Sequence, residues 1–240
     1  MIQRIVAMTA TGLLGLLSST GALALESGFY LGALGAQATL DVDKSEFSGG
    51  PTSNYSSTVD DTDTAFGIFA GGQFGRWFAV ESQLIDLGKY SEATSVSLTN
   101  YFPTAPRNLD VHSRASIEAA AFTLSGILTI PIGEQVAIGL RGGFAVSAAE
   151  TRYEIVERRG NTIYYQESDD NDAEASDLTA TFGVSVEWDP SQHFGMRLEY
   201  QRINDVGSED DDYDGEDFDD EEEHGGYDID LISLHLVGRF

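Results

Sequence analysis

The sequence lacks cysteine and has few prolines and few basic residues. Without cysteine it has neither a disulfide framework nor a thiolate metal site. Only 13 Lys and Arg residues stand against 40 Asp and Glu, and the net charge of −27 argues against nucleic acid as a partner. Five prolines beside 26 glycines, 13 phenylalanines and 10 tyrosines favour twisted β-structure over helix. The 240 residues are enough for one or two domains.

Long apolar runs are also missing after the first 24 residues, so no later segment has the roughly 18 apolar residues of a spanning helix. The first 24 residues have a positive charge at Arg4, an apolar stretch over 5–17 and the cleavage-site pattern Ala22-Leu23-Ala24. These features predict a secretory signal peptide over 1–24 and a mature chain over 25–240. The alternative is a retained helical anchor. In a Gram-negative cell the mature chain is then periplasmic, secreted or an outer-membrane barrel.

An alternation of period two runs through the mature chain, and this is the period of β-strands. At the C-terminus, alternate residues from Ile232 to Phe240 are apolar, and those between them include Ser233, His235 and Arg239. Eight such segments are predicted, near 27–40, 64–74, 77–89, 115–130, 135–150, 178–188, 193–204 and 228–240.

The connections between these segments alternate in length. Three are tight turns, and four are long and polar, at approximately 41–63, 90–114, 151–177 and 205–227. All long connections then lie at one end. This layout predicts an all-β fold, an eight-stranded antiparallel up-and-down transmembrane β-barrel with short periplasmic turns and four long extracellular loops.

The two faces of the strands favour a membrane barrel over a soluble one. One face is almost uniformly apolar, whereas the other mixes small residues with charges at matching depth on several strands. Such charges are tolerated inside an eight-stranded barrel if they pair there. The predicted ion network of the lumen consists of Glu81, Arg141, Glu187, Arg197 and Glu199. A soluble sandwich or lipocalin-like barrel is the structural alternative.

Several stretches resemble the OmpA-type β-barrel domain. FGVSVEWDPSQHFGMRLEYQRINDVG at 182–207 is similar to its last hairpin, and LISLHLVGRF at 231–240 to its closing strand. FAVESQLIDLG at 78–88 resembles the third strand and LRGGF at 140–144 the fifth. The resemblance covers all eight segments in layout and is most specific over the last 60 residues.

The resemblance implies a charged cluster across the lumen, with Glu81, Glu187 and Arg197 at the matching positions. The family's fourth strand adds a lysine before the short turn. Ile127 stands there instead, and Arg141 is the candidate to compensate. We expect a structural network, in which Arg197 is the buried partner of Glu187; a conduction gate is the alternative.

The end of the sequence also fits the resemblance. The chain stops at Phe240, so the resemblance implies the barrel alone, without the peptidoglycan-binding domain of full-length members. Phe240 is predicted as the terminal signal that the barrel-assembly machinery reads, in addition to a place in the aromatic girdle.

Catalysis is not expected. Ser233 and His235 share a strand face, but alternate residues are about 7 Å apart along a strand. A hydrolase needs serine and histidine within hydrogen-bond reach and a third group that orients the base. His235 is therefore expected to fill the lumen, and no catalytic residue is predicted.

Residues 208–223, SEDDDYDGEDFDDEEE, form an acidic run in which Asp210, Asp212, Asp214 and Glu221 match a calcium-loop pattern. The run lies between two predicted strands, not helices, so it is not an EF-hand. The ordinary interpretation is a hydrated, self-repelling loop. Weak Ca²⁺ binding, with bridges to lipopolysaccharide phosphates, is the alternative, and no other cofactor is expected.

Together these features predict a structural protein of the Gram-negative outer membrane that contributes to envelope integrity. The expected partners are outer-membrane lipids, lipopolysaccharide and the barrel-assembly machinery, and a monomer is expected. The alternatives are binding or adhesion through the loops, divalent-cation binding at the surface, or a narrow porin-like channel.

Overall fold

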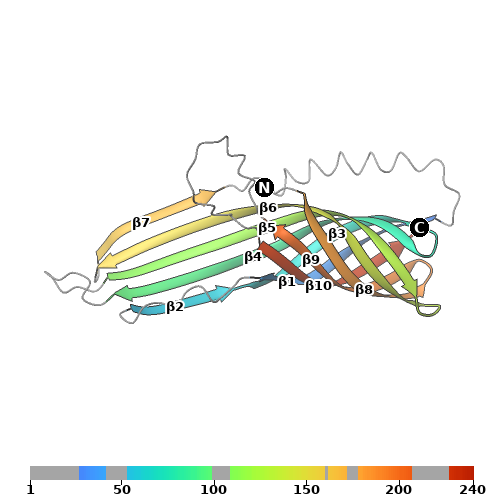
Figure 1. The fold of residues 1–240 in the computed structure, drawn as a ribbon, viewed down its shortest axis with the longest axis horizontal. Coiled ribbons are helices and arrows are strands. Elements are labelled where there is room, and N and C mark those ends of the chain that lie inside the picture. The colour runs from blue at the N-terminus through green and yellow to red at the C-terminus, as the bar shows by residue number, and fades with distance from the viewer. Residues whose placement is uncertain (1–26, 42–52, 99–108, 160–161, 172–177, 207–226) are drawn as a thin grey trace, which may run out of the picture.

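Antiparallel strands make up nearly all of the part of the chain that the computed structural model describes, which is residues 27–41, 53–98, 109–159, 162–171, 178–206 and 227–240 (Figure 1). The ten strands are β1 (Ser27–Asp41), β2 (Ser53–Asp60), β3 (Thr62–Phe74), β4 (Phe78–Leu98), β5 (Leu109–Pro131), β6 (Val136–Arg159), β7 (Thr162–Asn171), β8 (Thr179–Ser191), β9 (Phe194–Val206) and β10 (Tyr227–Arg239).

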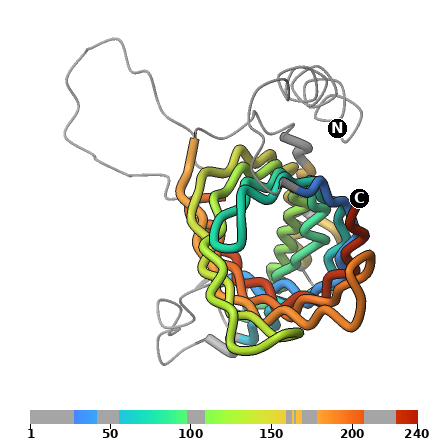
Figure 2. The backbone as a smooth tube through the Cα atoms, turned by 90° about the vertical axis from the view of Figure 1, so that its right-hand side faces the viewer, coloured from blue at the N-terminus to red at the C-terminus, as the bar shows by residue number. Residues whose placement is uncertain are grey.

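Eight of these strands close into a barrel. Hydrogen bonding follows the order β1, β3, β4, β5, β6, β8, β9, β10, and β10 pairs again with β1. Figure 2 shows the ring end-on. The predicted up-and-down barrel is confirmed. Closure pairs each strand of the barrel wall on both sides, which a lipid environment requires because it offers no water to unpaired backbone groups.

The long connections are more ordered than expected. Strands β4, β5 and β6 continue well past the barrel wall, and β2 and β7 pair with their extensions. The resulting projecting sheet has the order β2, β4, β5, β6, β7 and extends from one end of the barrel (Figure 1). The interpretation of 41–63, 90–114 and 151–177 as loops is therefore corrected in part. Segments such as TSVSL at 94–98 keep the alternation of a strand, and pairing with a neighbour outweighs their polarity.

Strand alternation separates two environments in the barrel wall. Residues that point outward are large and apolar and remain exposed, as expected of a lipid-facing surface: examples are Leu31, Phe66, Ile68, Phe144, Phe182, Leu198, Ile232 and Leu236. Residues that point inward are buried in the lumen. No helix in the described ranges is long and apolar enough to span a membrane.

Small residues in the wall make room for large ones in the lumen. A Cβ atom at Gly71 of β3 would lie 2.4 Å from the ring of Tyr30 on the adjacent β1. The Tyr30 ring therefore crosses the lumen directly over this glycine, where any side chain would collide with it.

Candidate functional site in the barrel lumen

Four charged residues from three strands meet in the middle of the lumen. This central ion cluster consists of Glu81 on β4, Arg141 on β6, and Arg197 and Glu199 on β9. Arg141 contacts Glu81 at 2.6 Å and Glu199 at 2.9 Å, while Arg197 contacts Glu81 at 2.8 Å and Glu199 at 3.8 Å. All four side chains are at most 3% exposed. Two carboxylates face two guanidiniums, so the cluster is formally neutral.

Neighbouring side chains support the cluster. The amide of Gln83 donates a 2.9 Å hydrogen bond to Glu81. The guanidinium of Arg197 lies 5.7 Å from the centre of the Phe69 ring and 6.0 Å from that of Tyr30, within the range of cation–π attraction. These contacts compensate part of the large desolvation cost of burying four charges.

Arg141 provides the second cation of the cluster. Its direct cross-strand neighbour is Ile127 on β5, the position at which the resemblance implied a lysine. Ile127 is buried, and it leaves space into which the longer Arg141 side chain reaches toward Glu81 and Glu199. The positive charge has thus moved to the adjacent strand.

Glu187 belongs to a different group from the one predicted. It is directly opposite Arg197 in the β8–β9 ladder, yet its ion pair is with Arg239 of β10, which also contacts Asp189 at 2.6 Å. The expectation that Arg197 is the ion-pair partner of Glu187 is wrong, because Arg197 pairs with Glu81 and Glu187 pairs with Arg239. Arg197 leans to Glu81, and Glu187 leans to the terminal strand. We call Glu187, Asp189 and Arg239 the rim cluster.

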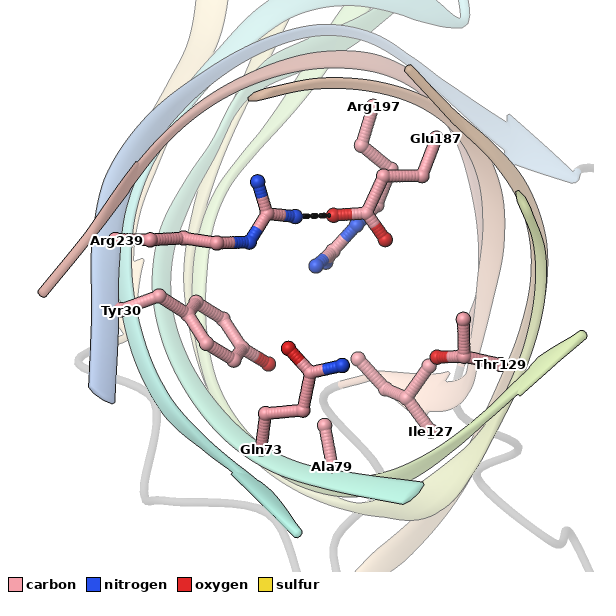
Figure 3. Close-up of a pocket in the computed structure, with 8 residues that line it drawn as sticks. All are labelled: Tyr30, Gln73, Ala79, Ile127, Thr129, Glu187, Arg197 and Arg239. Atoms are coloured by element: carbon pink, nitrogen blue, oxygen red, sulfur yellow. Dashed lines mark hydrogen bonds and ion pairs between the residues drawn. The ribbon is translucent and has the colours of Figure 1, made fainter. Parts of the chain in front are cut away.

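A small cavity separates the two clusters at the end of the barrel where the short turns lie. It has a volume of about 20 Å³ and is lined by Tyr30, Gln73, Ala79, Ile127, Thr129, Glu187, Arg197 and Arg239 (Figure 3). This volume suffices for about one water molecule. No solute larger than water fits there.

Beyond the central ion cluster, toward the projecting sheet, the lumen becomes largely apolar. Along β4 the inward residues pass from Glu81 and Gln83 to Ile85 and Leu87, and along β9 from Glu199 and Gln201 to Ile203. This apolar layer consists of buried side chains from six strands: Leu34, Ala38, Leu40, Ala65, Ile85, Leu87, Ala119, Ala121, Ile203, Ile229 and Leu231. The lumen is therefore closed by charged contacts and, separately, by apolar packing.

Ser233 and His235 are closer than the strand spacing suggested. The Ser233 hydroxyl and His235 Nε2 are hydrogen-bonded at 2.8 Å, so the expectation that they lie out of reach is wrong. The side-chain tips approach although the Cα atoms do not. Glu199 lies 4.0 Å from the same Nε2, and Nδ1 has no hydrogen-bond partner among the described residues. A catalytic triad instead needs serine and acid on opposite ring nitrogens. As predicted, His235 fills the lumen, where it contacts Phe69.

Of the remaining predicted site residues, Phe240 is the one that the structure describes. Asp210, Asp212, Asp214 and Glu221 are outside the described residues, and so is the predicted signal peptide. Within the described ranges, no group of three or more acidic or histidine side chains could hold a metal ion. The Phe240 amide donates a hydrogen bond to the carbonyl of Phe29 at 2.9 Å, and its ring is exposed. Its role as an assembly signal stays a prediction.

A family model described as "OmpA-like transmembrane domain" matches residues 25–240. The chain belongs to this family. It is accordingly an outer-membrane protein that crosses the membrane as a β-barrel. The resemblance inferred from the last hairpin, the closing strand and strand layout is confirmed. A comparison with curated protein sequences gives no match.

Solved structures with a similar layout are small outer-membrane barrels. Neisserial surface protein A is 12% identical, with 88% of this chain and 97% of that chain covered and a TM-score of 0.41. Ail, the attachment invasion locus protein of Yersinia pestis, is 11% identical, with 89% and 97% covered and a TM-score of 0.38. OprG from Pseudomonas aeruginosa is 14% identical, with 90% and 95% covered and a TM-score of 0.39.

Sequence reasoning missed Arg239 as a lumen residue of this OmpA-like barrel. The alternation of the last strand could have identified it, because Arg239 continues the inward series Leu231, Ser233, His235 and Val237. The apolar layer was missed for another reason. Inward and outward apolar residues have the same composition, and only the burial in a closed ring distinguishes them.

Proposed function

We propose that this OmpA-like barrel is a structural component of the outer membrane and contributes to envelope integrity without passing solutes. The observation that carries the proposal is the double closure of the lumen. An eight-stranded barrel has just enough interior for side chains. Here that interior holds a neutral ion cluster and, next to it, a layer that consists mainly of buried apolar side chains.

This arrangement also argues against the alternative of a narrow channel. An ion that displaced the contacts of the central ion cluster would next meet a layer of buried aliphatic side chains. Charges in such surroundings lose their hydration without a replacement ligand, at a cost of several kcal/mol or more. Conduction would require both barriers to rearrange together. We also propose that the protein has no catalytic role.

Conductance measurements test the closed lumen. The mature chain, refolded into planar bilayers, is expected to give no steady ion current at neutral pH. Replacement of Leu231 and Ile85 with Gly and of Arg141 with Met would weaken both barriers and is expected to produce a current. A steady current through the unaltered barrel would refute the proposal.

We also propose the partners of this protein. Lipopolysaccharide and other outer-membrane lipids would cover the apolar outer surface, the barrel-assembly machinery would insert the protein, and the barrel would remain a monomer.

For the acidic run at 208–223, weak Ca²⁺ binding is tested by calorimetry. Heat on Ca²⁺ addition that disappears when 207–226 is replaced with a short Gly-Ser linker would support it, and equal heat in both proteins would end it.

A second candidate is recognition by the part outside the membrane, and the projecting sheet favours it. On the orientation expected for this class, the sheet stands on the extracellular side. The projecting sheet presents exposed polar and aromatic side chains. One of them is Tyr165 of β7, whose hydroxyl donates a hydrogen bond to Glu167, and this hydrogen bond raises the pKa of Tyr165. Surface elements of this kind carry what recognition a barrel performs.

Truncation distinguishes the two functions. Ser91 of β4 and Ser116 of β5 are cross-strand partners, so a two-residue turn can replace 92–115 and remove the centre of the projecting sheet. In a deletion strain that has become permeable to detergents, the truncated barrel is expected to restore the barrier as well as the full chain. Failure to do so in folded form would favour recognition.

A further inference from the structure

A groove opens on the outer surface where the barrel wall ends and the projecting sheet begins. Its volume is about 600 Å³, within the size range of small-molecule sites. Its lining includes Asp63, Phe66, Asp86, Lys89, Glu118 and Glu150. The groove goes beyond the structural function proposed above, because it faces away from the lumen.

The groove exists because β4 changes partners there. β3 pairs with β4 up to Asp86, and β2 begins to pair with it only at Ser91. Between them β4 has a bulge with Gly88 at φ 88°, and the Asp63 carboxylate accepts the Lys89 amide at 2.7 Å. A Cβ atom at Gly88 would lie 2.7 Å from that carboxylate, so glycine is needed at this point.

The groove carries an electrostatic conflict that its own residues do not resolve. Lys89, Glu118 and Glu150 are consecutive cross-strand neighbours on one face of β4, β5 and β6. Lys89 pairs with Glu118 at 2.8 Å, but Glu150 has no ion-pair partner among the described residues. Like charges directly opposite in a sheet are destabilising. With Asp63 and Asp86, four carboxylates face one ammonium group, which leaves a formal charge of −3.

Apolar surface lies directly beside this acidic row. Phe66, at 63% exposure, lines the groove itself. The outward row that follows the row of Phe66 and Asp86 toward the short-turn end is wholly apolar, and it consists of the cross-strand neighbours Ile68, Leu84, Phe122 and Val146. Glu118 and Phe122 are four positions apart on β5, which corresponds to about 13 Å along the strand.

We propose that this groove binds a cationic amphiphile, a molecule with an ammonium head and an aliphatic tail. The head would lie between Glu118, Glu150 and Asp86 and relieve their repulsion. The tail would run over Phe66 onto the apolar row. Charge complementarity selects this occupant over an anionic lipid, whose phosphate the four carboxylates would repel.

Calorimetry on the full chain in phosphatidylcholine nanodiscs tests the proposal, with empty nanodiscs subtracted. The probe is decylammonium below its micelle-forming concentration. Each of two control compounds has one part of the probe. Decyl sulfate has the same tail with a negative head, and ethylammonium has the ammonium head without the long tail. Saturable binding is expected for decylammonium alone.

Variants separate the groove from general attraction to an acidic protein. Glu118→Gln with Glu150→Gln is expected to weaken decylammonium binding about fivefold, a change that two partly exposed charges can produce. Glu154→Gln, on the same face of β6 but outside the groove, is the matched control and is expected to bind as the unaltered protein. Lys89→Gln removes the competing cation and is expected to tighten binding about twofold.

Each outcome decides the proposal. Equal binding of decyl sulfate and decylammonium would show non-specific partition of the tail and overturn it. Equal affinities of the unaltered protein and the double variant would also overturn it, as would weaker binding by Lys89→Gln. If the double variant does not fold, Lys89→Gln and Phe66→Ala carry the test. Phe66→Ala is expected to weaken decylammonium binding about threefold through lost apolar contact.

Discussion

Replacement of Glu81 with Gln tests the central ion cluster most directly. The Glu81 carboxylate is fully buried and accepts hydrogen bonds from Arg141 at 2.6 Å, from Arg197 at 2.8 and 3.1 Å and from Gln83 at 2.9 Å. Gln has nearly the same shape but no charge, so two buried guanidiniums would share the single carboxylate of Glu199. The cluster would change from neutral to +1.

The expected cost follows from the loss of one partner in a buried ion network. Such a loss destabilises proteins by about 3–5 kcal/mol, because an uncompensated charge stays in the interior. With a urea m-value of about 2 kcal/mol per M, the unfolding midpoint would fall by about 2 M. Glu118→Gln breaks only a surface pair and is expected to change the free energy of unfolding by less than about 1 kcal/mol.

The assay is urea unfolding of the barrel in lipid vesicles. Trp77, in the turn between β3 and β4, and Trp188 of β8 are both about half exposed and report unfolding through their fluorescence. Gel mobility without boiling gives the folded fraction independently.

A second substitution determines whether charge balance is the cause. Glu81→Gln combined with Arg141→Met leaves one cation and one anion, Arg197 and Glu199, beside the apolar Ile127. This double variant is expected to be more stable than Glu81→Gln alone. The reasoning is refuted if Glu81→Gln costs less than about 1 kcal/mol, or if the two substitutions are additive.

Three further predictions use the same unfolding measurement. Gly71→Ala forces a methyl group into the Tyr30 ring and is expected to cost about 1–3 kcal/mol, whereas Gly72→Ala, whose Cβ meets its nearest atom at an ordinary 3.7 Å, should not differ from the unaltered protein. Leu198→Arg places a charge on the lipid-facing surface and is expected to cost up to about 2–4 kcal/mol; a change near zero would contradict a membrane-embedded wall. Arg239→Gln leaves two carboxylates of the rim cluster without a cation and is expected to cost about 1–3 kcal/mol, with a smaller loss at 1 M salt because the rim cluster is partly exposed. A loss independent of salt would place that cluster out of contact with water.

The projecting sheet illustrates where sequence reasoning stops. The segments 90–98 and 109–114 alternate in a pattern compatible with strands, but their Ser, Thr and Glu residues are equally typical of exposed loops. No buried face distinguishes the two in the sequence. Their strand structure depends on pairing with neighbours in space, since Ser91–Leu98 of β4 pairs with both β2 and β5.

The ion pairs illustrate the same limit inside the barrel. Alternation alone placed Glu81, Arg141, Glu187, Arg197 and Glu199 on the inward face. It could not assign partners, because each long side chain can reach several neighbours along and across the lumen. Glu187 and Arg197 are opposite in the ladder and nevertheless belong to different clusters.

The sequence by itself determined the barrel, its strand order and its two faces. A period of two fixes which side chains share a face, and alternating short and long connections fix an up-and-down order. Only the tertiary structure decided what fills the lumen and how far the strands extend. Closure of the ring brings β4, β6 and β9 together across the axis, and it is closure that pairs Arg141 with Glu81 and Glu199 and seals the lumen beside them with apolar side chains. Those contacts join residues about 60 positions apart or more, which no local pattern encodes.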